Sequence, residues 1–162
     1  MSHLQNPYDR DFVAWSKEQA AALRAAARAG SNLQLDWDNL AEEVETLGAS
    51  ERRALHSQLQ RILRHLLKLE FSPAVDPRRG WVETVEDARS DIEIVLETSP
   101  SLRNEVGPAI QAELPRAIGG AVRDLQRYGE IDAGGVSRLR TAQYTEEQVL
   151  GEWLPPEPAQ SR

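Results

Sequence analysis

The chain has 162 residues, of which 40% are hydrophobic and 28% charged, a composition typical of one globular domain with an ordinary core. Its 26 acidic and 19 basic residues give a net charge of −7, so the mean field repels nucleic acid and anionic membranes. There is no cysteine, which excludes disulfides, a thiolate nucleophile and cysteine-ligated zinc. Neither a signal peptide nor a membrane-spanning stretch is evident, and we expect a cytoplasmic protein without membrane contact.

Helix signals follow one another along the chain, and no segment shows the sustained alternation of a β-strand. The first predicted helix covers about residues 10–29 and is rich in alanine, which favours helix. Asp9 is its expected N-cap, and Gly30 is its expected end.

The next stretch predicts two helices separated by a short turn. One covers about residues 37–47, capped by Asp36, with an apolar stripe formed by Trp37, Leu40, Val44 and Leu47. Gly48 should end that helix, and Ser50 should cap another that covers about residues 51–71. The broad apolar arc of the latter helix predicts a central position with neighbours on two sides.

The remaining predicted helices cover about residues 77–98, 100–128 and 146–150. Pro108 and Pro115 should kink or split the middle one, because proline removes a backbone donor. The last helix is short, and Thr145 with Gln148 forms a capping box before it. The stretch between residues 129 and 140 has the composition of a loop.

Together these elements predict an all-α fold, an up-down helical bundle of about five helical segments plus a short C-terminal helix. We expect a single helical domain over residues 9–154. Residues 1–8 are expected to form a flexible N-terminus, and residues 155–162 a disordered tail.

Five motifs, in this order, identify a family likeness: YDRDFVAW, LDWDNLAEEVETLG, ERRALHSQLQRILRHLLKLEFSP, WVETVEDARSDIEIVLETSPSL and YTEEQVLGEWLP. The chain resembles the bacterial domain-of-unknown-function family twenty-nine from Tyr8 to Pro155. The resemblance implies an all-helical domain that stands alone in bacterial cells. It brings no reaction, ligand or catalytic residue with it.

Glu43, His65 and Arg89 form the candidate polar cluster, since each lies at the edge of an apolar helical face. They could form an interhelical salt-bridge network, or line an enzyme or ligand site. The Glu-x-x-His spacing of di-iron bundles is absent, because Ile62 precedes His65 at that position and Arg53 precedes His56. We therefore expect no bound metal and no cofactor.

Arg53, Arg61, Arg64 and Lys68 form a candidate basic ridge on the helix over residues 51–71. Such a ridge could contact phosphate. However, no aromatic residue interleaves it, and the acidic residues of the preceding helix should neutralise it, so nucleic-acid binding should be weak.

These observations favour a non-catalytic helical domain that works by protein–protein contact, with an unknown protein or a second copy of the chain as its partner. One alternative is an enzyme or small-ligand binder that uses Glu43, His65 and Arg89. Another is weak nucleic-acid binding through the basic ridge.

Overall fold

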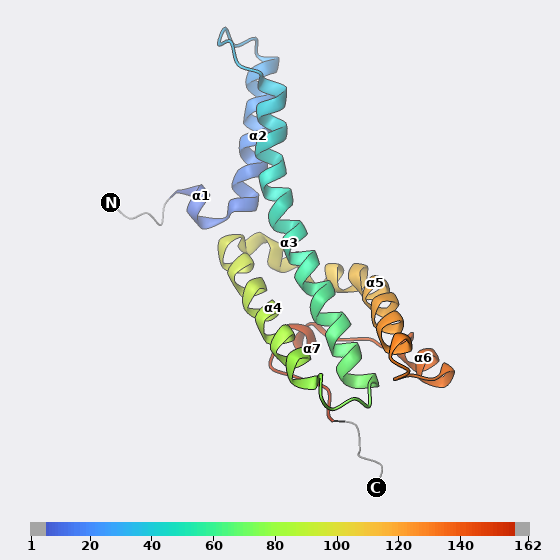
Figure 1. Cartoon of the computed structure of the whole chain (residues 1–162). Helices are drawn as coiled ribbons and strands as arrows, with labels where there is room; N and C mark the ends of the chain where they lie inside the picture. Colours follow the sequence, from blue (N-terminus) through green and yellow to red (C-terminus); the bar gives the residue numbers. More distant parts are fainter. Residues whose placement is uncertain (1–5, 158–162) are drawn as a thin grey trace. The chain divides into compact units, whose positions relative to one another are not determined.

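The computed structural model describes residues 6–157, which contain seven α-helices, one 3₁₀ helix and no strand (Figure 1). The helices are α1 (Pro7–Arg10), α2 (Phe12–Arg28), α3 (Trp37–Phe71), α4 (Arg78–Thr98), η2 (Pro100–Glu105), α5 (Val106–Arg127), α6 (Ala133–Leu139) and α7 (Glu146–Leu150). The predicted all-α fold is confirmed. None of these helices is both long and apolar enough to cross a bilayer.

The described residues fall into two compact units. Unit 1 contains the chain up to Leu55 together with Glu93–Glu105. Unit 2 contains His56–Ile92 and the chain from Val106 onward. Each unit has its own buried side chains, and the prediction of a single domain over residues 9–154 stays a prediction.

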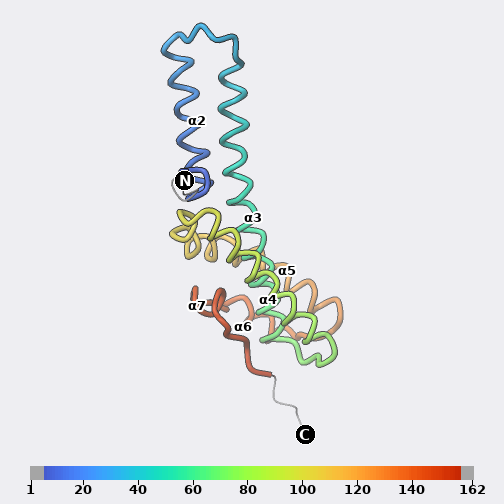
Figure 2. The backbone as a smooth tube through the Cα atoms, turned by 90° about the vertical axis from the view of Figure 1, so that its left-hand side faces the viewer, coloured from blue at the N-terminus to red at the C-terminus, as the bar shows by residue number. Residues whose placement is uncertain are grey.

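Unit 1 is built on a helical hairpin. α2 and the first half of α3 run side by side in opposite directions, joined by the segment over residues 29–36 (Figures 1 and 2). Gly30 has a φ of +73°, which suits glycine and ends α2 as predicted. The N-cap is Asp11 rather than Asp9, because the Asp11 carboxylate accepts the Ala14 N–H at 2.8 Å.

The predicted helix break at Gly48 is wrong, because α3 continues without interruption from Trp37 to Phe71. A Cβ at Gly48 would lie only 2.1 Å from the Oγ of Ser16 on α2. This glycine therefore allows a close approach of α2 and α3 rather than ending a helix. Ser50, the expected cap, lies inside α3, where its hydroxyl donates to the Thr46 carbonyl at 3.0 Å.

Unit 2 packs the second half of α3 among α4, α5 and the short C-terminal helices. The part of α3 in this unit buries a continuous apolar arc consisting of Leu59, Ile62, Leu63, Leu66, Leu67 and Leu69. These six side chains are at most 1% exposed, as expected of a central helix. Pro115 lies inside α5, which nevertheless runs continuously to Arg127.

The C-terminal part contains one helix that was not predicted. α6 forms in the stretch expected to be a loop, although two of its seven residues are glycine. The Asp132 carboxylate caps it by accepting the Gly135 N–H at 2.7 Å. α7 has the predicted capping box, in which Thr145 and Gln148 bond each other's backbone N–H.

Only part of each predicted terminal segment is described. Residues 7 and 8 of the expected flexible N-terminus begin α1, and residues 1–5 lie outside the described residues. Residues 155–157 of the expected tail have no regular structure, and the rest of that tail is likewise outside the described part.

Candidate interaction surface

The contact between α2 and α3 in the hairpin is closest where small side chains meet, and unit 1 also has Val13 buried and Trp37 and Val44 half-buried. Ala20 and Ala41 are fully buried there, and Ser16 packs against Gly48. Small residues let two helices approach closely, but they bury little apolar area. These small residues therefore contribute close packing to the hairpin rather than a large buried apolar area.

Large apolar side chains of the same hairpin remain exposed to solvent. Leu40 and Leu47 on α3 are 41% and 49% exposed. Leu33 and Leu35, in the segment between the two helices, are 65% and 48% exposed. Large apolar side chains that remain exposed in one part of a molecule are typical of interaction sites.

An aromatic cluster lies at the start of α2. The ring centroids of Tyr8 and Trp15 are 4.9 Å apart, edge to face, and Phe12 stacks on Trp15 at 5.8 Å. Edge-to-face and offset pairs are the favoured arrangements of aromatic rings. Tyr8 is 47% exposed, so the cluster extends the apolar surface of unit 1.

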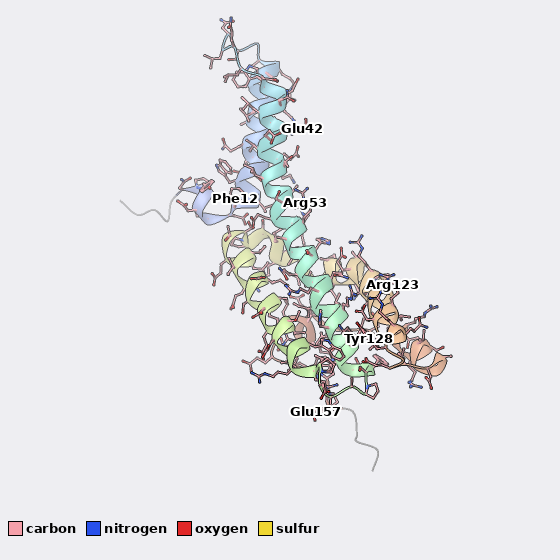
Figure 3. The ribbon with its side chains drawn as sticks, viewed as in Figure 1. Phe12, Glu42, Arg53, Arg123, Tyr128 and Glu157 are labelled. Carbon is pink, nitrogen blue, oxygen red and sulfur yellow. The ribbon has the colours of Figure 1, made fainter. Side chains whose placement is uncertain are left out.

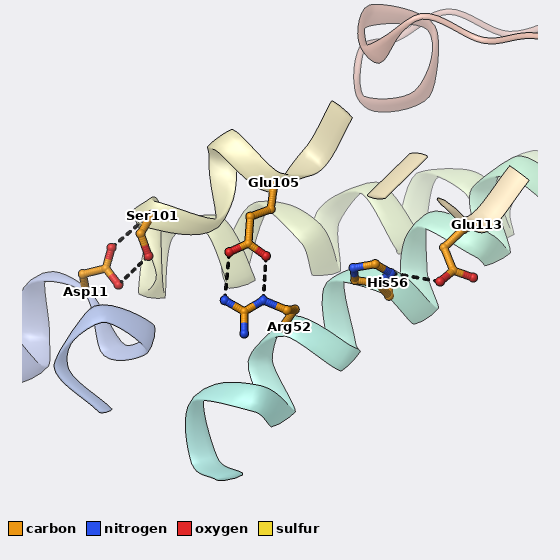
Figure 4. A network of polar contacts seen from close by, with 6 residues as sticks. All are labelled: Asp11, Arg52, His56, Ser101, Glu105 and Glu113. Carbon is orange, nitrogen blue, oxygen red and sulfur yellow. Dashed lines mark hydrogen bonds and ion pairs between the residues drawn. The ribbon is translucent and has the colours of Figure 1, made fainter. Parts of the chain in front are cut away.

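Two polar contacts attach η2 to the hairpin of unit 1 (Figure 4). The Asp11 carboxylate accepts both the backbone N–H and the hydroxyl of Ser101, at 2.6 and 3.0 Å. Arg52 donates two hydrogen bonds to Glu105, at 2.6 and 2.8 Å, in the bidentate geometry of a strong pair. Asp11 therefore caps α2 and holds η2 with one carboxylate.

In unit 2, Asp124 is the centre of a charged cluster. Arg64 donates to both Asp124 oxygens, at 2.9 and 2.7 Å, and the Lys68 ammonium lies 3.7 Å from Oδ2. Although burial opposes it, the Arg64 hydrogen bond lowers the pKa of Asp124 below its ordinary value. Burial lowers the pKa of Lys68, whose ammonium also lies 4.6 Å from the centre of the Trp81 ring.

A cavity of about 420 Å³ opens beside this charged cluster. Its walls include Lys68, Trp81, Asp124 and Tyr128. The volume lies within the range of sites that bind small molecules.

His56 and Glu113 form a second polar pair in unit 2. His56 Nδ1 and Glu113 Oε1 are 2.9 Å apart (Figure 4). Glu113 is only 7% exposed and also accepts a 3.2 Å bond from Arg116. Nothing in the sequence singles out Glu113, because it is one acidic residue among the 26 of the chain.

The structure does not bring Glu43 and His65 of the predicted polar cluster together. They lie 22 positions apart on the single helix α3, which corresponds to about 33 Å along its axis. Glu43 is exposed, whereas His65 is half-buried and its Nδ1–H donates to the Arg61 carbonyl at 2.8 Å. Burial lowers the pKa of His65 even though that hydrogen bond acts in the opposite direction.

Arg89, the third member, bonds backbone atoms of the C-terminal segment. Its guanidinium donates to the carbonyl oxygens of Gln148, Val149 and Trp153, at 2.9, 2.9 and 2.7 Å. Two of these carbonyls belong to α7, whose final turn has no helical donors for them. Arg89 therefore attaches the C-terminal segment to α4.

The four residues of the predicted basic ridge all lie on α3, but their surroundings differ. Arg53 and Arg61 are exposed, and Arg53 appears on α3 in Figure 3. Arg64 and Lys68 are paired with Asp124, so half of the ridge is neutralised by α5. Within residues 6–157, no group of three or more histidine, aspartate or glutamate residues is placed to hold a metal ion.

Glu70 has a partner in the C-terminal part. The Tyr144 hydroxyl donates to Glu70 Oε2 at 2.6 Å, and Tyr144 is buried. Burial and this hydrogen bond raise the pKa of Tyr144 far above its ordinary value, so the hydroxyl stays a donor.

The helices, their order and their caps define an all-helical domain without strands in the described range. The chain belongs to the family described as Domain of unknown function DUF29, whose model matches residues 7–154. It is also similar to an alpha-helical protein of unknown function from Rhodospirillum rubrum, whose crystal structure was determined at 1.45 Å resolution. The two chains are 26% identical over 91% of each, with a TM-score of 0.75. A search of curated proteins found no match.

Proposed function

We propose that the chain is a non-catalytic domain that acts by protein–protein contact through the apolar side of the α2–α3 hairpin. The observation that carries the proposal is the exposure of the large apolar side chains of Leu40 and Leu47 on α3, together with that of Leu33 and Leu35 in the segment before it. Water contact with such side chains is unfavourable, and cover by a partner would remove it. In this proposal the partner is a protein rather than nucleic acid or membrane, and the location is the cytoplasm.

Site-specific photo-crosslinking in cells tests this function. A photoreactive phenylalanine analogue at Leu40 should give a discrete adduct, identified by mass spectrometry. The matched control is the same analogue at Glu42, which lies two positions further along α3 and is exposed (Figure 3). Adducts of equal yield at both positions, or none at position 40, would contradict the proposal.

A second candidate function, binding of a small ligand, is favoured by the cavity in unit 2. There Lys68 and Trp81 offer a cation and an aromatic face beside the Asp124 carboxylate. The proposed binding residues are therefore those that line the cavity, in place of the cluster of Glu43, His65 and Arg89 that was predicted from the sequence. A library screen by thermal shift tests it: a genuine ligand should raise the Tm of the native chain and lose this effect in Lys68→Ala but keep it in Arg61→Ala.

A further inference from the structure

Four charged side chains line the cavity beside Trp81 in unit 2: Lys68 and Arg127 are cations, and Asp124 and Glu130 are carboxylates. We call this hollow of about 420 Å³ the Lys68 cavity. Equal numbers of both charges do not by themselves indicate the charge of a ligand. The hydrogen bonds that each group already makes do indicate it, because a group without a partner gains most from a ligand.

The carboxylates of the Lys68 cavity already accept hydrogen bonds from the protein. Both oxygens of Asp124 accept bonds from Arg64, at 2.9 and 2.7 Å. Glu130 Oε2 accepts a bond from the buried Ser72 hydroxyl at 2.7 Å. Three of the four carboxylate oxygens thus have a donor, which reduces the attraction of the cavity for a ligand cation.

The ammonium of Lys68 is the opposite case. The Lys68 side chain is only 14% exposed, and burial lowers the pKa of Lys68 although the Asp124 carboxylate acts in the opposite direction. Lys68 Nζ lies 3.7 Å from Asp124 Oδ2, which is an ion pair but too long for a hydrogen bond. This ammonium has therefore lost much of its hydration without gaining a hydrogen-bond acceptor among residues 6–157. An acceptor that enters the cavity would stabilise it.

Arg127 and two aromatic side chains complete the walls that a ligand would contact. Like Lys68, Arg127 donates no hydrogen bond to the protein in the described part of the chain. Tyr128 follows α5 directly and is 72% exposed (Figure 3). Trp81 holds the Lys68 ammonium 4.6 Å from its ring centre. Aromatic surface thus lies next to a cation that lacks a hydrogen-bond acceptor.

We propose that the Lys68 cavity binds an aromatic carboxylate, with the carboxylate group on the Lys68 ammonium and the ring against Tyr128 and Trp81. The inference rests on the second candidate function, the binding of a small ligand, and names the ligand class. A carboxylate supplies the acceptor that Lys68 lacks, and a charge-assisted bond of this kind is among the stronger hydrogen bonds. The ring would cover Tyr128, which is otherwise in contact with water.

The two carboxylates of the cavity wall limit the negative charge that a ligand can carry. An anion on the Lys68 ammonium also comes close to Asp124, because these two groups lie only 3.7 Å apart. Arg64 already pairs with Asp124, so Lys68 and Arg127 can balance a ligand with one negative charge. A phosphate monoester carries between one and two negative charges at about pH 7, and Asp124 and Glu130 would repel it more strongly. The cavity therefore favours a carboxylate over a phosphate.

Titration of the isotope-labelled full chain with four indole compounds, followed by NMR, tests the ligand class. Indole-3-acetate, indole-3-acetamide and tryptamine share one ring and are negative, neutral and positive at about pH 7, and indoxyl phosphate carries the larger negative charge. The shifts of amide and indole N–H signals give the dissociation constants. Indole-3-acetate should bind at least about 10-fold more tightly than the amide, since its bond to Lys68 is charge-assisted. Tryptamine and indoxyl phosphate should both bind more weakly than indole-3-acetate.

Three variants test the role of Lys68 in this preference. In Lys68→Gln, indole-3-acetate should bind no more tightly than indole-3-acetamide, whereas Lys68→Arg keeps a cation and should keep part of the preference. The matched control is Arg61→Gln, which removes the same charge from an exposed position of α3 outside the cavity and should leave every dissociation constant unchanged. If Lys68→Gln loses its helical circular dichroism, nuclear Overhauser contacts from the indole ring to Tyr128 and Trp81 in the native chain locate the ligand instead.

Equal binding of the acid and the amide would overturn the inference, and so would tighter binding of tryptamine or indoxyl phosphate. In those cases binding of a small ligand in unit 2 would still stand. Binding of indole-3-acetate that Lys68→Gln leaves unchanged, or that brings the ring near neither Tyr128 nor Trp81, would also refute the proposed site. If none of the four compounds binds up to about 10 mM, the inference fails, and the thermal-shift screen alone decides the second candidate function.

Discussion

Replacing Gly48 by alanine should destabilise the hairpin, although glycine is a poor residue in the middle of a helix. The new Cβ would lie 2.1 Å from Ser16 Oγ and 3.3 Å from Ser16 Cβ. The first distance is far below van der Waals contact, and the second is tight. Ser16 can rotate its hydroxyl away only by losing the 2.9 Å hydrogen bond to the Val13 carbonyl.

The expected size of the effect follows from three contributions. Alanine in place of glycine favours a helix by about 1 kcal/mol. Overpacking a close contact costs about 1–3 kcal/mol, and losing a buried hydrogen bond costs about another 1 kcal/mol. The free energy of unfolding should therefore fall by about 1–3 kcal/mol in Gly48→Ala.

Urea unfolding followed by circular dichroism measures this change, and the chain contains a matched control. Gly80, in α4, has nothing within 4 Å of an added Cβ. Gly80→Ala should therefore benefit from the higher helix propensity of alanine without a steric cost, and it should stabilise unit 2 by about 0.5–1 kcal/mol. In a Ser16→Ala background the cost of Gly48→Ala should also shrink, because the closest atom is gone. If Gly48→Ala stabilised the protein as Gly80→Ala does, the close approach at Gly48 would be refuted.

Three further predictions concern unit 2, each measured by urea unfolding across pH. Asp124→Asn should lower the free energy of unfolding by about 1–2 kcal/mol at pH 7. Because the folded-state pKa of Asp124 is lowered, the full difference should be present above about pH 4, and it should vanish as the pH falls through the folded-state pKa. The folded-state pKa of His65 is also lowered, so the native chain should lose stability as the pH falls below about 6.5, and His65→Gln should show a smaller loss between about pH 7.5 and 5.5. Tyr144→Phe removes the hydrogen bond to Glu70 and should cost about 1 kcal/mol at pH 7, whereas unchanged stability would mean that water replaces this bond.

The sequence predicted elements well where their ends are marked by local chemistry. Gly30 ends α2 through its positive φ, and Pro77 precedes α4, which begins at the next residue. The Thr145–Gln148 capping box also appears as expected. Caps and prolines act within a few residues, so a single sequence contains the information that decides them.

The sequence was insufficient where a distant part of the chain determines the structural role of a residue. A glycine that ends a helix and one that admits a neighbouring helix look alike in sequence, and only the position of Ser16 distinguishes them at Gly48. The partners of Arg89 are backbone carbonyls about 60 residues away, which every residue type offers equally. The candidate cluster of Glu43 and His65 depended on a turn that α3 does not make.

The apolar stripe formed by Trp37, Leu40, Val44 and Leu47 shows the same limit for function. Its spacing is visible in the sequence as the apolar side of a helix, and such a stripe is usually covered within the same chain. In the structure, Ala41 and Gly48 are buried and Trp37 and Val44 are half-buried, which leaves Leu40 and Leu47 exposed. Leu33, Leu35, Leu40 and Leu47 of the hairpin thus remain available for an external contact.

The final prediction concerns the stability of this hairpin. Most of the stability of a helix in a protein comes from packing of its apolar face, so a partner that covers the exposed Leu40 and Leu47 should stabilise the hairpin. If the partner is a second copy, mass action raises stability by about 1.4 kcal/mol for each tenfold increase in protein concentration. With an unfolding slope near 2–3 kcal/mol per molar urea, the midpoint should rise by roughly 0.5 M per tenfold increase.

Measuring this dependence in unit 1 requires a local probe. A fluorophore on Leu33→Cys would report the hairpin, because the chain has no other cysteine and Leu33 is exposed between its helices. The midpoint should move with concentration in this labelled chain and in its Thr46→Glu derivative, and stay fixed in its Leu47→Glu derivative. A midpoint independent of concentration in all three would mean that Ala20, Ala41 and the Ser16–Gly48 contact stabilise the hairpin without a partner. The exposed leucines would then contribute nothing to its folding through a second copy of the chain.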